Sequence, residues 1–221
     1  MKVLVISVHP DDETLGCGGT ILKHSQNQDE IFWLIMTKPL ESIGYSTEFI
    51  IKRKLQITNA TKQYQFRDVF ELNMITTKLH LVDFSEIIQK LSSIINKIKP
   101  EVLYMVNRSD IHTDHQVAAK AILSSTKSFN SSFIKKILMY ECLSETEIAP
   151  PFTENIFLPN SYSNITEFIE KKIEIIKIYD NELQEFPFPR SENSIRALNR
   201  FRGSTVGVEY AEAFMLVREL F

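Results

Sequence analysis

The sequence lacks the features of several protein classes. It has only two cysteines, Cys17 and Cys142, without Cys-x-x-Cys spacing, so a disulfide framework is not predicted and a reducing compartment fits. No apolar run approaches the roughly 20 residues that cross a membrane. The apolar run after Met1 is short, and residues 9–12 stand where a signal peptide would have its small-residue cleavage site. We therefore expect a cytoplasmic protein with no membrane span.

A strong charge of either sign is also missing. The chain has 25 Lys and Arg against 28 Asp and Glu, a formal net charge of −3 at pH 7, which argues against nucleic acid as a partner. There are no internal repeats, low-complexity tracts or linkers. With 221 residues the chain can bury a sizeable core, and we expect a single domain over residues 1–221. The oligomeric state stays open, with a homo-oligomer among the alternatives.

Apolar and amphipathic segments alternate along the chain. Apolar runs predict strands at residues 3–8, 31–36, 69–74, 102–106 and 136–141. Helices are predicted at 20–24, 48–64, 84–98 and 116–123, then from a capping box at Asn164 onward, and at 193–201, closed by Gly203. The alternation predicts an α/β fold, a mostly parallel sheet with helices on both faces.

Two clusters of histidines and carboxylates directly follow predicted strands. Residues 9–19 read HPDDETLGCGG, and residues 107–115 read NRSDIHTDH. Because the carboxyl ends of parallel strands meet at one edge of a sheet, we expect the clusters to converge although roughly a hundred residues separate them. Three of the five histidines fall in these clusters, so the sequence predicts a site at this edge.

Imidazole and carboxylate ligands together suit a borderline divalent cation such as Zn²⁺. A catalytic zinc site uses three protein ligands and leaves a position for water, and the candidate ligands are His9, Asp12 and His115. The neighbouring Asp11 could then take a proton from water at the metal, and His112 could donate to the leaving group or an oxyanion. Asp114 could orient that imidazole.

A purely structural interpretation of the first cluster is also available. Asp11 or Asp12 could simply cap the first helix, and the three glycines could let that helix pack closely on the strand. A single His-x-x-Asp pattern would be mostly chance. Two such clusters, each after a strand, favour the functional interpretation.

The pattern resembles a known family. Residues 9–21, HPDDETLGCGGTI, resemble the first motif of the PIG-L/LmbE-like N-acetylglucosaminyl deacetylases, and residues 112–115, HTDH, resemble their second. Residues 210–214, YAEAF, resemble the motif near the C-terminus of the family's members. The resemblance implies a Rossmann-like fold, one catalytic Zn²⁺ and hydrolysis of an N-acetyl group from an amino sugar or glycoconjugate.

The resemblance also implies roles for individual residues. His9, Asp12 and His115 match the zinc ligands, which leaves the other members of the two motifs for the chemistry. Asp11 corresponds to the general base, and His112 corresponds to the general acid or electrophile. Asp114 corresponds to the carboxylate that orients the histidine. Glu13 has no part in this chemistry, and we expect it to support the loop.

The substrate side matches the family less closely. Arg53 stands where members often have a substrate-binding arginine, followed by Gln56 where Glu is frequent. Asp110 occupies a position that is Tyr in some members, so an oxyanion donor must come from elsewhere, with Tyr210 as a candidate. Arg53, Asp110 and Tyr210 are the predicted substrate-binding residues.

The sequence therefore predicts a zinc-dependent deacetylase in which Asp11 activates a water at the metal. Two alternatives stay open. The same metal site could hydrolyse another amide or an ester, or the protein could be a non-catalytic, metal-dependent carbohydrate-binding protein.

Overall fold

A computed structural model describes all residues, 1–221. The strands are β1 (Lys2–Ser7), β2 (Glu30–Lys38), β3 (Asp68–Ile75), β4 (Val102–Val106), β5 (Lys136–Tyr140), β6 (Ser161–Asn164) and β7 (Ala211–Glu219). The helices are α1 (Asp12–Gln26), α2 (Thr47–Tyr64), α3 (Phe84–Ile98), α4 (Thr113–Ser125), α5 (Ile169–Ile176) and α6 (Glu192–Ser204). Together they form the α/β fold that the alternation predicts.

The seven strands form one sheet in the order β3-β2-β1-β4-β5-β7-β6. The first five pair in parallel, whereas β7 is antiparallel to both β5 and β6. The mostly parallel sheet is thus confirmed. The strand order reverses between β1 and β4, and ligands of open α/β sheets bind at such a switch point, outside the carboxyl ends of the strands.

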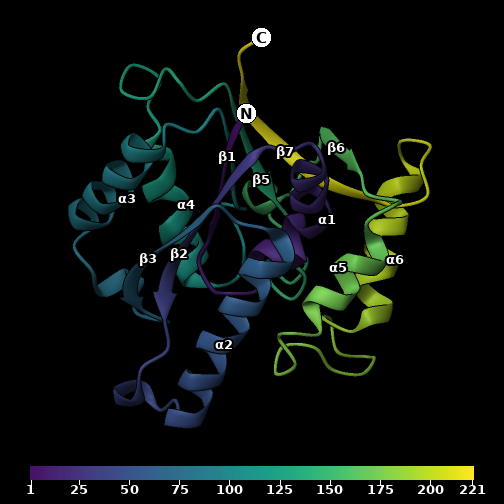
Figure 1. The fold of residues 1–221 in the computed structure, drawn as a ribbon, viewed down its shortest axis with the longest axis horizontal. Coiled ribbons are helices and arrows are strands. Elements are labelled where there is room, and N and C mark those ends of the chain that lie inside the picture. Colours follow the sequence, from purple (N-terminus) through teal and green to yellow (C-terminus); the bar gives the residue numbers. More distant parts are fainter.

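Helices cover both faces of the sheet. Helices α3 and α4 lie on one side of the sheet, and α1, α2, α5 and α6 lie on the other (Figure 1). This cover explains why β1 and β4 are buried almost throughout and consist of nearly uninterrupted apolar residues. No helix has the length and apolar character that crossing a membrane requires.

Several boundaries differ from those predicted. Helix α1 begins at Asp12 and α4 at Thr113, so parts of both clusters form first helical turns rather than loops. The Asn164 side chain accepts from the Thr166 N–H and hydroxyl in a turn, and α5 begins only at Ile169. Gly203 lies inside the last turn of α6, where a Cβ atom would come within 2.7 Å of backbone oxygens of residues 208 and 209.

Helix α1 is broken at Cys17, whose φ of −144° and ψ of 22° are not helical. After the break, the backbone N–H of Thr20 donates to the Glu212 carboxylate at 2.7 Å. Before the break, the Leu15 carbonyl accepts from Lys172 Nζ at 2.9 Å. Lys172 and Glu212 pair at 2.7 Å and are fully buried. This ion pair therefore satisfies backbone groups on both sides of the break.

The Lys172–Glu212 pair gives a stability prediction. Glu212→Gln should lower the free energy of unfolding by about 3–5 kcal/mol, because Lys172 is then a buried cation without a counter-charge. Urea denaturation of the variant beside Glu174→Gln, which removes an exposed carboxylate of the same α5 region, measures the difference. Unfolding free energies for the two variants that agree within about 1 kcal/mol would contradict the role given to the pair.

Candidate functional site

The first cluster forms the turn between β1 and α1. Asp11 has a φ of 144°, a conformation that costs free energy for a residue with a Cβ atom. Two contacts stabilise the turn: the Asp11 N–H donates to Glu13 Oε2 at 3.0 Å, and Arg53 donates to the Pro10 carbonyl at 2.7 Å. Glu13 also accepts from the Tyr179 hydroxyl at 2.9 Å. Burial raises the pKa of Glu13 to about 8.

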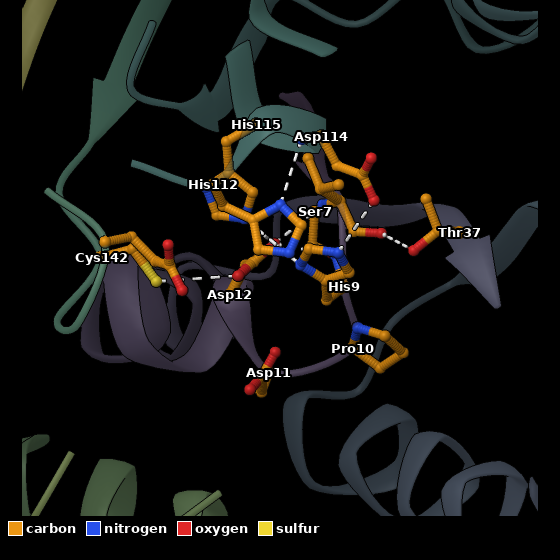
Figure 2. A network of polar contacts seen from close by, with 12 residues as sticks. Ser7, His9, Pro10, Asp11, Asp12, Thr37, His112, Asp114, His115 and Cys142 are labelled. Atoms are coloured by element: carbon orange, nitrogen blue, oxygen red, sulfur yellow. Dashed lines mark hydrogen bonds and ion pairs between the residues drawn. The ribbon is translucent and has the colours of Figure 1, made fainter. Parts of the chain in front are cut away.

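Three of the predicted ligands converge at the switch point between β1 and β4 (Figure 2). His115 Nε2 lies 3.3 Å from His9 Nδ1 and 3.3 Å from Asp12 Oδ2. His9 Nδ1 and Asp12 Oδ2 are 3.9 Å apart. These atoms come from the turn after β1, the first turn of α1 and the first turn of α4. The fold thus brings together residues that lie far apart in the sequence.

Each histidine of this set has a carboxylate behind it. Asp114 Oδ2 lies 3.4 Å from His9 Nε2, and Asp110 Oδ2 lies 2.9 Å from His115 Nδ1. A carboxylate accepts a hydrogen bond from the ring nitrogen that it faces, so when both rings are neutral the opposite nitrogens, His9 Nδ1 and His115 Nε2, present lone pairs to each other. The Asp114 carboxylate, expected to orient His112, lies against His9 instead, and Asp114 contacts His112 through its backbone N–H.

Two lone pairs and a carboxylate that face one another repel unless a cation lies between them. The donor set therefore fits a divalent metal ion. The carboxylates of Asp12 and Asp110 raise the pKa of His115 above its usual range, although burial acts in the opposite direction. The negative charge that favours a proton at this imidazole equally favours a metal cation.

A second set of possible ligands overlaps the first. His9, His112 and Asp114 also bring their ligand atoms within reach of one ion. However, the Asp114 carboxylate already accepts from the backbone N–H groups of Thr77 and Leu79, at 2.6 and 3.1 Å. His112 Nδ1 accepts from the Asp114 N–H at 3.1 Å. Both carboxylates thus accept backbone N–H groups, but in the set with Asp12 and His115 neither facing imidazole nitrogen does, and we take that set as the cation site.

Asp12 is fixed by the backbone as well as by the histidines. Its Oδ2 accepts from the N–H groups of Val8 and His9, at 2.9 and 2.8 Å, and its Oδ1 lies 3.7 Å from the Cys142 thiol. Burial would raise the pKa of this carboxyl, but His115, His9 and the backbone hold it below the usual range. Asp12 is therefore an anion in position to hold a metal ion.

Asp11 lies in the same turn but belongs to a different network. Its Oδ2 accepts from Arg190 Nη1 at 2.9 Å. Burial raises the pKa of Asp11 to about 7, and the Arg190 guanidinium acts against this rise. A carboxyl with a pKa near neutrality exchanges protons readily, as a general base must.

His112 caps the start of α4 and faces the pocket. Its Nδ1 accepts the Asp114 N–H, so the proton of the neutral ring is on Nε2. Burial and the neighbouring imidazoles of His9 and His115 lower the pKa of His112 to about 4. The ring is therefore neutral near pH 7, and Nε2–H can donate a hydrogen bond to a bound carbonyl.

A pocket of about 330 Å³ opens beside these residues, within the size range of small-molecule sites. His9, Asp11, His112 and the predicted Arg53 line it. Asp110 and Tyr210 do not, which corrects their assignment to substrate binding. Asp110 is fully buried behind His115. The backbone of Tyr210 pairs with Ile165 and Thr166, near the β6–β7 edge.

The pocket also contains residues that sequence reasoning missed. They come from the segment before α2, the first turn of α2, the segment after β5 and the segment between α5 and α6: Tyr45, Phe49, Glu145, Glu182 and Arg190. No spacing or periodicity connects these segments. Residues 186–190, where two prolines predict an extended chain, instead form turns, so no local pattern indicates that Arg190 reaches the pocket.

Comparison with known proteins identifies a common family and fold. The family model described as GlcNAc-PI de-N-acetylase (PIG-L) matches residues 4–126, more than half of the chain. A diacetylchitobiose deacetylase from Thermococcus kodakarensis is 23% identical over 236 residues, covering 100% of this chain and 84% of that protein.

Solved structures show the same fold. An N,N'-diacetylchitobiose deacetylase from Pyrococcus horikoshii superposes with a TM-score of 0.77 at 22% identity, over 98% of this chain and 83% of that one. A 4-carboxy-2-hydroxymuconate hydratase from Pseudomonas putida has a TM-score of 0.75 at 15% identity, over 100% and 97% of the two chains. The fold alone thus does not determine the reaction.

The Asp110 carboxylate behind His115 gives a prediction about metal affinity. Asp110→Asn should weaken binding of Zn²⁺ or Co²⁺ by about 10–100-fold, because His115 loses the acceptor that fixes its tautomer and orientation. His115→Ala should lose stoichiometric metal altogether. Titration against a competing chelator measures both, with His80→Ala, an exposed histidine, as the control. Wild-type affinity in His115→Ala would remove His115 from the ligand set.

Proposed function

Because this chain belongs to the PIG-L family of GlcNAc-PI de-N-acetylases, we propose that it is a zinc-dependent hydrolase of N-acetylated amino sugars. It would remove the acetyl group from an amino sugar or its conjugate, releasing acetate and a free amine. The observation that carries this proposal is the pairing of a cation site with a separate carboxyl of near-neutral pKa, Asp11, on one pocket wall. Amide hydrolysis needs both a Lewis acid and a base.

His9, Asp12 and His115 would hold the metal ion. Their mixed nitrogen and oxygen donors suit Zn²⁺, and iron, manganese or cobalt could occupy the same set. When bound, the ion supplies positive charge that acidifies water and stabilises negative charge on the carbonyl oxygen.

Asp11 would take one proton from the attacking water as its oxygen adds to the acetyl carbon. The same carboxyl can return that proton to the amide nitrogen, so the C–N bond breaks with a neutral amine as the leaving group. The Arg190 guanidinium supports this cycle, because it opposes the rise in the pKa of Asp11 that burial causes.

His112 would act as an electrophile rather than as a cationic acid. With its pKa lowered to about 4, the neutral ring offers Nε2–H to the oxygen on which negative charge develops. Of the two roles that the sequence suggests for His112, general acid or electrophile, this supports the second. The neutral ring is the form that the surrounding imidazoles and burial favour.

Other reactions at this site stay as alternatives. Hydrolysis of a different amide or an ester would use the same residues, and a hydratase shares the fold. A metal-dependent carbohydrate-binding protein would not need Asp11. Acetate release from a panel of N-acetylated sugars, compared with simple esters, separates these functions.

Asp11 gives the most direct functional prediction. Asp11→Asn in metal-replete protein should lower kcat for acetate release by about 10²–10⁴-fold, because the base is lost while the metal ligands stay in place. Metal content measured on the same samples should be unchanged. Wild-type kcat in Asp11→Asn would exclude Asp11 as the base, and removal of the metal by a chelator should abolish turnover in the wild type.

A further inference from the structure

The pocket contains two arginines whose charges are already neutralised within the protein. Arg53 donates to the Pro10 carbonyl and to Glu182 Oε1. Arg190 Nη1 donates to Asp11 Oδ2 at 2.9 Å and to Glu182 Oε2 at 3.2 Å, and Arg190 Nη2 donates to Glu145 Oε1 at 3.1 Å. Neither guanidinium is left without a carboxylate partner.

Glu182 is the residue that joins the two arginines. Its two oxygens contact one guanidinium each, so the carboxylate bridges the two cations. A phosphate or carboxylate on a substrate would need this same position to pair with both arginines. The side chain is 27% exposed and lines the pocket wall, where substrate can approach it.

The charge of the pocket wall points in the same direction. Three carboxylates, Asp11, Glu145 and Glu182, face two guanidinium groups, so neither arginine is free to pair with an anion from outside. An anionic substituent entering here would meet like charges in a partly buried site, which weakens its binding.

We propose that Glu182 makes the site selective for uncharged glycosides and against sugar phosphates and nucleotide sugars. This inference rests on the proposed function for the reaction itself. The Glu182 carboxylate would occupy the position in which a substrate anion could pair with both arginines. It would thereby determine which class of substrate binds.

An aromatic pair at the same pocket supports an uncharged ring as the substituent of the substrate's amino sugar. The rings of Tyr45 and Phe49 have centroids 5.0 Å apart, and both are half-buried pocket residues. Arg53 lies 5.1 Å from the Phe49 ring centre. Aromatic side chains in a pocket wall suit the apolar face of a sugar ring. A second sugar unit is therefore the uncharged substituent that this wall fits.

The test compares Glu182→Gln with wild type and with Glu185→Gln. Glu185 is an exposed glutamate on the same segment without a side-chain partner, so this control removes an equal charge away from the arginines. We measure kcat/KM for acetate release from N,N'-diacetylchitobiose and from N-acetylglucosamine 1-phosphate, using metal-loaded protein.

Wild type and Glu185→Gln should prefer the uncharged substrate by about tenfold or more, since one uncompensated close charge is worth at least that factor. Glu182→Gln should reduce this preference by about tenfold, mainly through a lower KM for the phosphate. A wild type that prefers the phosphate would overturn the inference. So would a Glu182→Gln variant that loses activity equally on both substrates.

A binding measurement separates failure of this inference from failure of the proposed function. Calorimetry compares glucosamine with glucosamine 1-phosphate, neither of which needs turnover. Absence of acetate release from every sugar would refute deacetylation, while the calorimetric preference still decides the selectivity. Tighter binding of the phosphate by wild type than by Glu182→Gln would overturn the role of Glu182.

Discussion

The site depends on the repulsion among three acceptor atoms that the fold holds together. His9 Nδ1, His115 Nε2 and Asp12 Oδ2 lie within 3.3–3.9 Å of one another, and when both rings are neutral the imidazole nitrogens face each other with lone pairs. A cation between them turns this repulsion into attraction. The strand order, which reverses between β1 and β4, provides the place where atoms from both clusters meet.

The surrounding hydrogen bonds give neighbouring residues different tasks. Asp110 and Asp114 accept from the far nitrogens of the histidines and thereby set their tautomers. Asp12 accepts backbone N–H groups and stays anionic, whereas burial moves the pKa of Asp11 to about 7. Both aspartates are buried, and their pKa values differ because the imidazoles and backbone N–H groups outweigh burial at Asp12, whereas Arg190 does not outweigh it at Asp11. Glu182 bridges the two arginines, and by our inference this bridge selects the substrate for the same site.

The sequence predicts those parts of the structure that depend on local pattern. The parallel strands and the convergence of the two clusters follow from apolar runs and from the position of each cluster after a strand. The proposed ligand set can be predicted from the sequence because its members lie within short motifs. The sequence does not predict which histidine the Asp114 carboxylate contacts, because His9 and His112 are both candidates from the sequence alone. Arg190 contacts Asp11 and Glu182 only because tertiary packing brings the three residues together. No sequence spacing indicates these contacts.

The most direct test of this account is the position of the metal ion in crystals of the loaded protein. Anomalous diffraction at the zinc edge should place one ion about 2.0–2.1 Å from His9 Nδ1 and His115 Nε2, with Asp12 as the third protein ligand. His112 and Asp114 should stay outside its coordination sphere. A single ion bound instead by His112 and Asp114 would contradict the assignment of lone pairs from which the rest of the account follows.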